Sequence, residues 1–223
     1  MKLLLFDIDG TLVLSGGAGL RAMNQAFEHL FSIKDALTGI QLAGRTDTSI
    51  ILDAGEKHKL TLDDAIIAQY KQTYFSFLPE EMAKPNAEKR AMPAVEQLLP
   101  KLAVQKDIYL GLLTGNWETS GRIKLAHFDF EKYFSFGAFA DDSVDRNKLV
   151  PFALQRFEEK YSVQIDRQDV YVIGDTPADI QCAKPHGVTS VAVAAAHYST
   201  ADLAAHQPDI LLDDLYGAEK IFI

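Results

Sequence analysis

Cysteine is almost absent from this sequence, since Cys182 is the only one among 223 residues. A single cysteine excludes an internal disulfide and a metal site built from several thiolates, and it favours a reducing compartment. No apolar run approaches the roughly 18 residues of a membrane helix. The apolar run at the N-terminus meets Asp7 too soon to form the core of a signal peptide. We therefore expect a cytoplasmic protein with no membrane partner.

Basic residues are also scarce relative to acidic ones. The chain has 22 Lys and Arg against 31 Asp and Glu, a net charge of −9. This balance argues against nonspecific nucleic-acid binding, which depends on Lys and Arg. Anionic small molecules stay possible, because a local cation can override the overall sign. The six histidines form no close metal-binding pair, and neither G-x-S-x-G nor G-x-x-x-x-G-K-[ST] occurs. We expect a monomer or a weak dimer.

The first strong pattern is an apolar run that ends at a carboxylate. Residues 2–6, Lys-Leu-Leu-Leu-Phe, lack alternation and predict a strand buried on both faces. Asp7 and Asp9 follow at once, with Gly10 to turn the chain and Thr11 to add a hydroxyl. Ligands of open α/β sheets bind outside the carboxyl ends of the strands. The pattern therefore predicts a functional site at Asp7 and Asp9.

Two carboxylates this close repel each other. At about 4 Å and an effective dielectric constant near 20, the repulsion is on the order of 4 kcal/mol. A divalent cation, a retained proton, or both must offset it. The alternative is an acidic surface turn without function.

The order of elements predicts a parallel sheet with a helical insertion. Residues 14–87 carry helical periodicity throughout, for example at Leu20, Met23 and Phe27. Strands and helices alternate afterwards, with strands expected at 108–113, near 136–139, at 170–173, 190–193 and 210–212. Strands separated by helices indicate a parallel sheet.

Two residues of the insertion stand out. Asp47 is expected to cap a helix that carries Ile50, Ile51 and Leu52. Arg45 follows Gly44, which lets its loop approach another surface closely. Arg45 is either a substrate contact or a solvated loop charge.

Polar clusters end three of the predicted strands: Asp7 with Asp9, Thr114 with Asn116, and Asp175 with Asp179. With a cation near residue 146, these clusters resemble, in order and spacing, the four motifs of the haloacid dehalogenase superfamily. The resemblance covers essentially the whole chain and is to the phosphoglycolate phosphatase-like branch with a helical cap. It implies an α/β fold, a three-layer α/β/α Rossmann-like core of residues 1–13 and 88–223, and a cap of residues 14–87.

The resemblance also implies roles for the clustered residues. Asp7 would be the nucleophile that forms an aspartyl phosphate, and Asp9 the general acid and then base. Thr114 would bind the phosphoryl oxygens. Substrate contacts would come from Thr11, Gly115, Asn116 and Arg45. Mg²⁺ would be held by Asp7, the Asp9 backbone carbonyl, Asp175 and Asp179.

Arg146 and Lys148 compete for the role of the cation beside the phosphoryl group. Pro151 must lie in the first turn of the following helix, which places the helix start near Asn147 or Lys148. Arg146 then takes the pre-helix position that the family's lysine occupies. The sequence favours Arg146, with Lys148 second.

We expect a Mg²⁺-dependent phosphatase that acts on a small phosphomonoester. A phosphomutase, similar to β-phosphoglucomutase, could use the same aspartyl phosphate. A non-catalytic phosphate-receiving module also places an acceptor Asp at a strand end, but it is shorter and has no cap.

Overall fold

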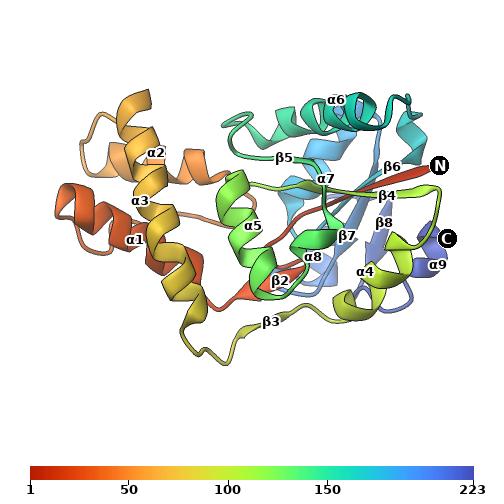
Figure 1. Cartoon of the computed structure of the whole chain (residues 1–223), viewed down its shortest axis with the longest axis horizontal. Helices are drawn as coiled ribbons and strands as arrows, with labels where there is room; N and C mark the ends of the chain where they lie inside the picture. The colour runs from red at the N-terminus through yellow and green to blue at the C-terminus, as the bar shows by residue number, and fades with distance from the viewer.

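The computed structural model describes all residues 1–223. Its centre is a six-stranded parallel sheet in the order β5-β4-β1-β6-β7-β8 (Figure 1). These strands are β1 (Lys2–Phe6), β4 (Ile108–Leu113), β5 (Gly137–Ala138), β6 (Val170–Gly174), β7 (Thr189–Val193) and β8 (Ile210–Leu212). The α/β fold class predicted from the sequence is confirmed.

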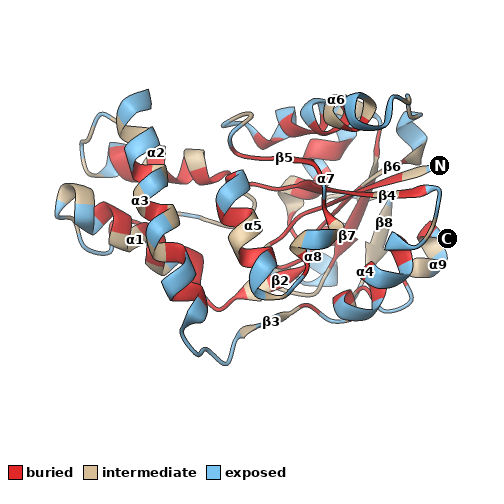
Figure 2. Cartoon of the chain, viewed as in Figure 1, coloured by how far each residue is buried: buried red, intermediate tan, exposed pale blue.

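Helices cover both faces of the sheet because β1 is apolar on both. Leu4 and Phe6 pack with α4 (Val95–Ala103), α5 (Glu118–His127) and α9 (Glu219–Phe222). Leu3 and Leu5 pack with α6 (Leu149–Tyr161) and α7 (Pro177–Ala183) on the opposite face. A short helix, α8 (Thr200–Ala204), lies beside β8. The central strands are accordingly the most buried part of the core (Figure 2).

Three helices stand apart from the sheet, at the left of Figure 1. They are α1 (Ala18–Phe31), α2 (Asp47–Lys57) and α3 (Asp64–Ala83), and they share an apolar cluster that includes Phe27, Tyr70 and Trp117. Trp117 belongs to the sheet side, so this cluster also joins the helices to the core. We propose that residues 14–87, the predicted cap, act as one unit.

A two-stranded antiparallel ribbon carries the chain into and out of this unit. It pairs β2 (Val13–Ser15) with β3 (Lys89–Ala91). The ribbon was not predicted, because each strand has only three residues and β3 is charged. Short 3₁₀ turns complete the chain at Glu131–Tyr133, Arg146–Lys148, Arg167–Asp169 and Lys184–His186.

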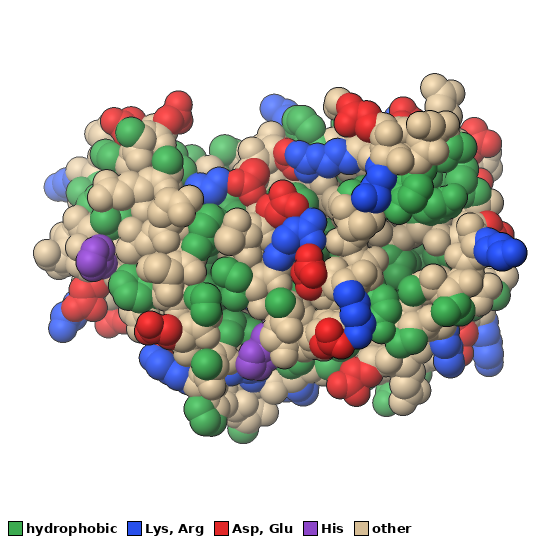
Figure 3. Space-filling view, in the orientation of Figure 1, with side chains coloured by type: hydrophobic (Ala, Val, Ile, Leu, Met, Phe, Trp, Pro, Cys, Tyr) green, Lys and Arg blue, Asp and Glu red, His purple; other side chains and the backbone are tan.

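Acidic and basic side chains are interspersed on the face shown in Figure 3. None of the helices is both long and apolar enough to cross a membrane.

Candidate active site

The carboxyl ends of β1, β4 and β6 meet at one cavity of about 590 Å³ between the sheet and the cap helices. Its lining includes Asp7, Asp9, Asn116, Arg146 and Asp175. These residues are far apart in the sequence and come together because parallel strands end at the same edge of the sheet. Most of the predicted site residues therefore share one cavity.

Asp7 and Asp179 flank the guanidinium group of Arg146. Arg146 Nη2 lies 3.0 Å from Asp7 Oδ2 and also forms an ion pair with Asp179 Oδ1. All three side chains are at most 7% exposed. Burial raises the pKa of Asp7, and Arg146 opposes that rise. Although burial alone would lower the pKa of Arg146, the carboxylates of Asp179 and Asp7 raise it. Arg146 is therefore a fixed cation beside Asp7.

Lys148 lies elsewhere. It is exposed at the end of the 3₁₀ turn and does not line the cavity. The turn is capped by Asp145, whose carboxylate accepts a hydrogen bond from Asn147 N, and helix α6 begins only at Leu149. The helix thus starts slightly later than predicted, while Arg146 keeps its place ahead of it.

Asp175 completes an acidic cluster with Asp7 and Asp179. Carboxylate oxygens of the three residues lie within 4.8 Å of one another. Burial, together with Asp179 and Asp7, raises the pKa of Asp175 to about 8. Asp175 Oδ1 accepts a hydrogen bond from Thr11 Oγ1 at 3.2 Å, whereas Oδ2 is buried and has no partner. An unpartnered buried carboxylate oxygen in an all-oxygen set fits a hard divalent cation.

Gly10 allows this cluster to be compact. Its φ of +84° lies in the left-handed region, and a Cβ at this position would meet Asp175 Oδ2 at 2.3 Å. Any other residue would displace the Asp175 carboxylate, whose Oδ2 has no partner. Thr11 faces Asp175 and contributes to the acidic cluster through its hydroxyl group.

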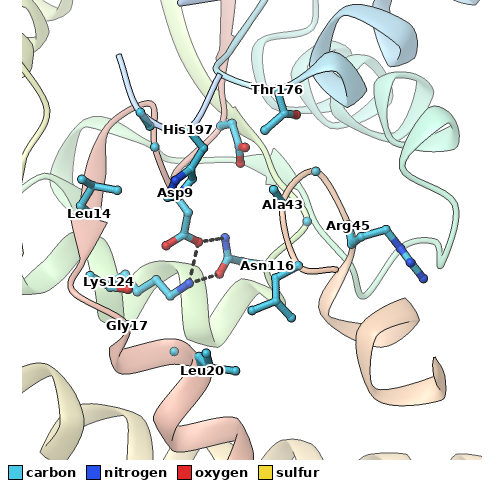
Figure 4. A pocket seen from close by; sticks show the side chains of 18 of the residues that line it. Asp9, Leu14, Gly17, Leu20, Ala43, Arg45, Asn116, Lys124, Thr176 and His197 are labelled. Atoms are coloured by element: carbon cyan, nitrogen blue, oxygen red, sulfur yellow. Dashed lines mark hydrogen bonds and ion pairs between the residues drawn. The ribbon is translucent and has the colours of Figure 1, made fainter. Parts of the chain in front are cut away.

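Asp9 lies on the open side of the cavity. Its side chain is 41% exposed, and Oδ2 accepts hydrogen bonds from Asn116 Nδ2 at 2.9 Å and Lys124 Nζ at 2.6 Å. Asn116 also donates to Thr114 Oγ1 at 2.8 Å and accepts from Lys124 at 2.6 Å. Figure 4 shows the linked side chains of Asp9, Asn116 and Lys124. Asn116 therefore orients Asp9 and Thr114 in this structure.

Lys124 is a cavity residue that was not predicted from the sequence. Helix α5 places it 5% exposed beneath the cap, and Asp9 and then Asp47 raise its pKa although burial opposes them. The sequence did place Lys124 three residues after Gly121, and therefore on the same side of the helix that follows Asn116. It could not show which acidic residue this side contacts, because that depends on the tertiary structure.

Asp47 does not cap helix α2, contrary to the prediction. Thr46 is the N-cap, and its hydroxyl accepts a hydrogen bond from Ser49 N at 3.1 Å. Asp47 Oδ2 instead accepts hydrogen bonds from Trp117 N at 2.9 Å and Ser120 Oγ at 3.0 Å. Burial raises the pKa of Asp47 to about 6. Asp47 thus joins the cap to the loop after β4.

Backbone contacts reinforce this junction. Asp47 N donates to Gly115 O at 2.6 Å, and a Cβ on Gly115 would lie 2.0 Å from the carbonyl oxygen of Arg45. Only glycine permits such an approach. Gly115 therefore contacts the cap through its backbone.

The Arg45 side chain turns toward helix α2. Its Nη2 lies 2.9 Å from Asp53 Oδ2, and its Nε donates to Ser49 Oγ. Figure 4 shows it extending away from Asp9 and Asn116. Arg45 nevertheless lines the cavity, and substrate binding by its side chain stays a prediction.

Fold and site together define a protein with a Rossmann-like parallel sheet and a buried acidic cluster at the carboxyl ends of its strands. The haloacid dehalogenase-like hydrolase family matches residues 4–193, and the chain belongs to this family. Phosphoglycolate phosphatase of Vibrio vulnificus (strain CMCP6) is 26% identical over 221 residues, which are 96% of this chain and 93% of that protein.

Solved structures share the fold at lower identity. A predicted phosphoglycolate phosphatase from Haemophilus somnus 129PT is 20% identical, with a TM-score of 0.71 over 100% of this chain and 98% of that one. CbbY from Rhodobacter sphaeroides, solved in complex with phosphate, is 19% identical, with a TM-score of 0.71 over 96% and 94% of the two chains. The family and the curated relative support a phosphatase activity.

Proposed function

We propose that this phosphatase is Mg²⁺-dependent and hydrolyses a small organic phosphomonoester through an aspartyl phosphate on Asp7. The observation that carries the proposal is the arrangement around Asp7. Its carboxylate lies 3.0 Å from the buried Arg146 cation and beside Asp175, which has an unpartnered oxygen. A nucleophilic carboxylate needs a cation beside it, because a phosphate monoester is itself an anion.

In the first step a carboxylate oxygen of Asp7 attacks phosphorus, and the bond between phosphorus and the alcohol oxygen breaks. Asp9 donates a proton to the departing alcohol. In the second step Asp9 accepts a proton from a water molecule that attacks the same phosphorus. The bond between phosphorus and the Asp7 oxygen breaks, phosphate leaves, and Asp7 is regenerated as a carboxylate.

Three groups of this chain hold the transferred phosphoryl group in this scheme. Arg146 neutralises its charge, Thr114 donates its hydroxyl, and the backbone beside Gly115 lies at the cavity wall. Asp7, Asp175, Asp179 and the Asp9 carbonyl would hold Mg²⁺, which supplies Lewis-acid stabilisation of the phosphoryl oxygens.

A hydrolysis screen tests the proposal. Purified protein with Mg²⁺ is offered a panel of small phosphate monoesters, with phosphoglycolate included because of the curated relative. We expect phosphate release from at least one member of the panel. Asp7→Asn should abolish phosphoenzyme formation and turnover, while Asp166→Asn, which alters an exposed carboxylate, should leave both unchanged.

The screen also separates hydrolysis from phosphoryl transfer. A phosphomutase would need a bisphosphate activator and would lose its phosphoenzyme slowly to water. Rapid phosphate release without an activator supports the phosphatase. Near-normal turnover by Asp7→Asn would overturn the mechanism.

A further inference from the structure

Lys124 is a buried cation that lines the cavity and has no role in the proposed mechanism. It projects from α5, a core helix, and its side chain is 6% exposed. Its Nζ lies 2.6 Å from Asp9 Oδ2 and 2.6 Å from Asn116 Oδ1. Helix α1 of the cap passes over it, since a Cβ on Gly19 would lie 3.4 Å from Nζ. The ammonium group is thus held between the cap and the acid.

The two oxygens of Asp9 are treated differently. Oδ2 accepts from both Lys124 Nζ and Asn116 Nδ2, at 2.6 and 2.9 Å. Oδ1 takes part in no hydrogen bond of the structure. The Asp9 side chain lines the cavity and is 41% exposed. Because Oδ2 has two donors, rotation of the carboxylate about its bond to Cβ is restricted. Oδ1 is the oxygen of Asp9 that carries no dashed line in Figure 4, and it keeps its capacity to bind a further group.

We propose that Lys124 is a positioning residue that fixes the Asp9 carboxylate through Oδ2, so that Oδ1 meets the leaving-group oxygen. The inference rests on the proposed function, in which Asp9 is the acid and base. Proton transfer requires the donor and acceptor within hydrogen-bond distance, and a misplacement of 1 Å can cost about 10²-fold in rate. Asn116 alone supplies one neutral donor, whereas Lys124 adds a charged one.

A direct substrate contact is the competing role for Lys124. Two of its three N–H donors are already used by Asp9 and Asn116, and one stays available. If Lys124 contacted the substrate directly, its loss would raise KM, whether or not the leaving group needs a proton. If Lys124 positions Asp9, its loss should lower kcat/KM more for a leaving group that needs a proton than for one that does not.

The test therefore compares two substrates. One is the best alkyl phosphate from the hydrolysis screen, whose alkoxide must be protonated, and the other is p-nitrophenyl phosphate, whose leaving group needs no proton. The value of kcat/KM reports steps up to the first irreversible one, which includes departure of the leaving group. Lys124→Met should lower kcat/KM for the alkyl phosphate about 10- to 100-fold and change it by less than about 3-fold for p-nitrophenyl phosphate. Lys124→Arg should recover part of the loss, because it keeps the charge.

Lys71→Met is the matched control. Lys71 also forms an ion pair between cap and core, with Asp141, but it does not line the cavity. This variant should leave the ratio of the two kcat/KM values unchanged. Melting curves of both Met variants show whether each is folded at the assay temperature, and Lys124→Arg carries the comparison if Lys124→Met is not.

A double mutant connects Lys124 to Asp9. If Lys124 acts only by holding Asp9, then Lys124→Met should cause no further loss of kcat/KM for the alkyl phosphate in the Asp9→Asn background. Multiplicative losses would overturn the inference, as would equal losses on both substrates. If Lys124→Met has the kinetics of the wild-type protein while Asp9→Asn is impaired, the inference about Lys124 is overturned and the proposed function stands. If Asp9→Asn itself has the kinetics of the wild-type protein, both the inference and the proposed role of Asp9 are overturned.

Discussion

Arg146 Nη2 lies 3.0 Å from Asp7 Oδ2, and both side chains are buried. The same nitrogen also binds Asp179, so one guanidinium joins the proposed nucleophile to an acid in the first turn of helix α7. Lys148, two residues later, is exposed. The two cations that the sequence left in competition are thus in very different surroundings.

The first prediction follows from that contrast. Arg146→Met should lower kcat/KM about 10²- to 10³-fold, because it removes a fixed positive charge beside the transferred phosphoryl group. Lys148→Met should change kcat/KM by less than about 2-fold, since the side chain is exposed and outside the cavity. Steady-state kinetics of both variants, at equal concentrations of folded protein, provide the measurement.

Stability must be followed in the same experiment. Removing one partner of a buried ion pair costs about 3–5 kcal/mol, because the remaining charge is left unpaired. Arg146→Lys keeps the charge and is the control for that loss. A larger loss of activity for Lys148→Met than for Arg146→Met would assign the phosphoryl contact to Lys148.

The second prediction concerns metal removal. Asp7, Asp175 and Asp179 concentrate negative charge in a buried space, and Asp175 Oδ2 has no partner there. A divalent cation that binds only the folded protein should stabilise it by about 2.7 kcal/mol at 100 times its dissociation constant. Thermal melts with Mg²⁺ and with excess chelator should therefore differ by several degrees.

Asp175→Asn identifies the site of this effect. The variant should lose most of the Mg²⁺-dependent shift in Tm, whereas Asp166→Asn, at an exposed position, should keep it. Equal melting temperatures for the wild-type protein with Mg²⁺ and with chelator, together with activity that survives chelation, would contradict the metal hypothesis.

The third prediction uses the cap residue Asp47. Its pKa is about 6 in the folded protein, chiefly because of burial, against 3.8 for an ordinary aspartate. The folded state therefore binds this proton more tightly than the unfolded state. Between about pH 6 and pH 4 the free energy of unfolding should rise as the pH falls, and above about pH 6 the charged Asp47 costs on the order of 3 kcal/mol.

Asp47→Asn isolates this contribution. The asparagine keeps an oxygen that can accept from Trp117 N and Ser120 Oγ but carries no charge. The difference in unfolding free energy, variant minus wild type, should increase from about pH 5 to about pH 8. Denaturant titrations at the two pH values measure it. A difference that does not change with pH would mean that Asp47 stays charged at no cost.

The sequence predicted the sheet, and it also predicted that the polar residues at the strand ends lie together, because both depend on local patterns. Apolar runs at 2–6, 108–113 and 170–173 each end in polar residues, and the geometry of parallel strands brings those ends together. Pro151 alone was enough to favour Arg146 over Lys148.

The rest depends on contacts that no local pattern encodes. Lys124 looks like an ordinary helical lysine until the fold places it against Asp9, more than 100 residues earlier. Asp47 looks like a helix cap until Thr46 takes that position and frees its carboxylate for Trp117. In both cases the identity of the partner comes from how the cap sits on the core.

The fourth prediction concerns Arg45, whose guanidinium is paired with Asp53 in this structure. We expect it to exchange Asp53 for the part of the substrate beyond the phosphate. Arg45→Ala should then raise KM for the natural substrate about 10-fold, the loss of roughly one charge-assisted hydrogen bond. It should leave p-nitrophenyl phosphate nearly unaffected, because that substrate lacks the natural leaving group.

Asp53→Asn is the matched variant, because it removes the competitor and keeps Arg45. It should leave KM unchanged or lower it. The Arg45–Asp53 pair is partly exposed, so its loss should cost at most about 1 kcal/mol of stability in either variant. If Arg45→Ala and Asp53→Asn give the same small loss of stability and neither changes KM, Arg45 serves only to hold the start of helix α2. If Arg45→Ala impairs both substrates equally, Arg45 acts on the phosphoryl group, and the specificity of the cavity must come from other cap residues such as Asp47 and Tyr74.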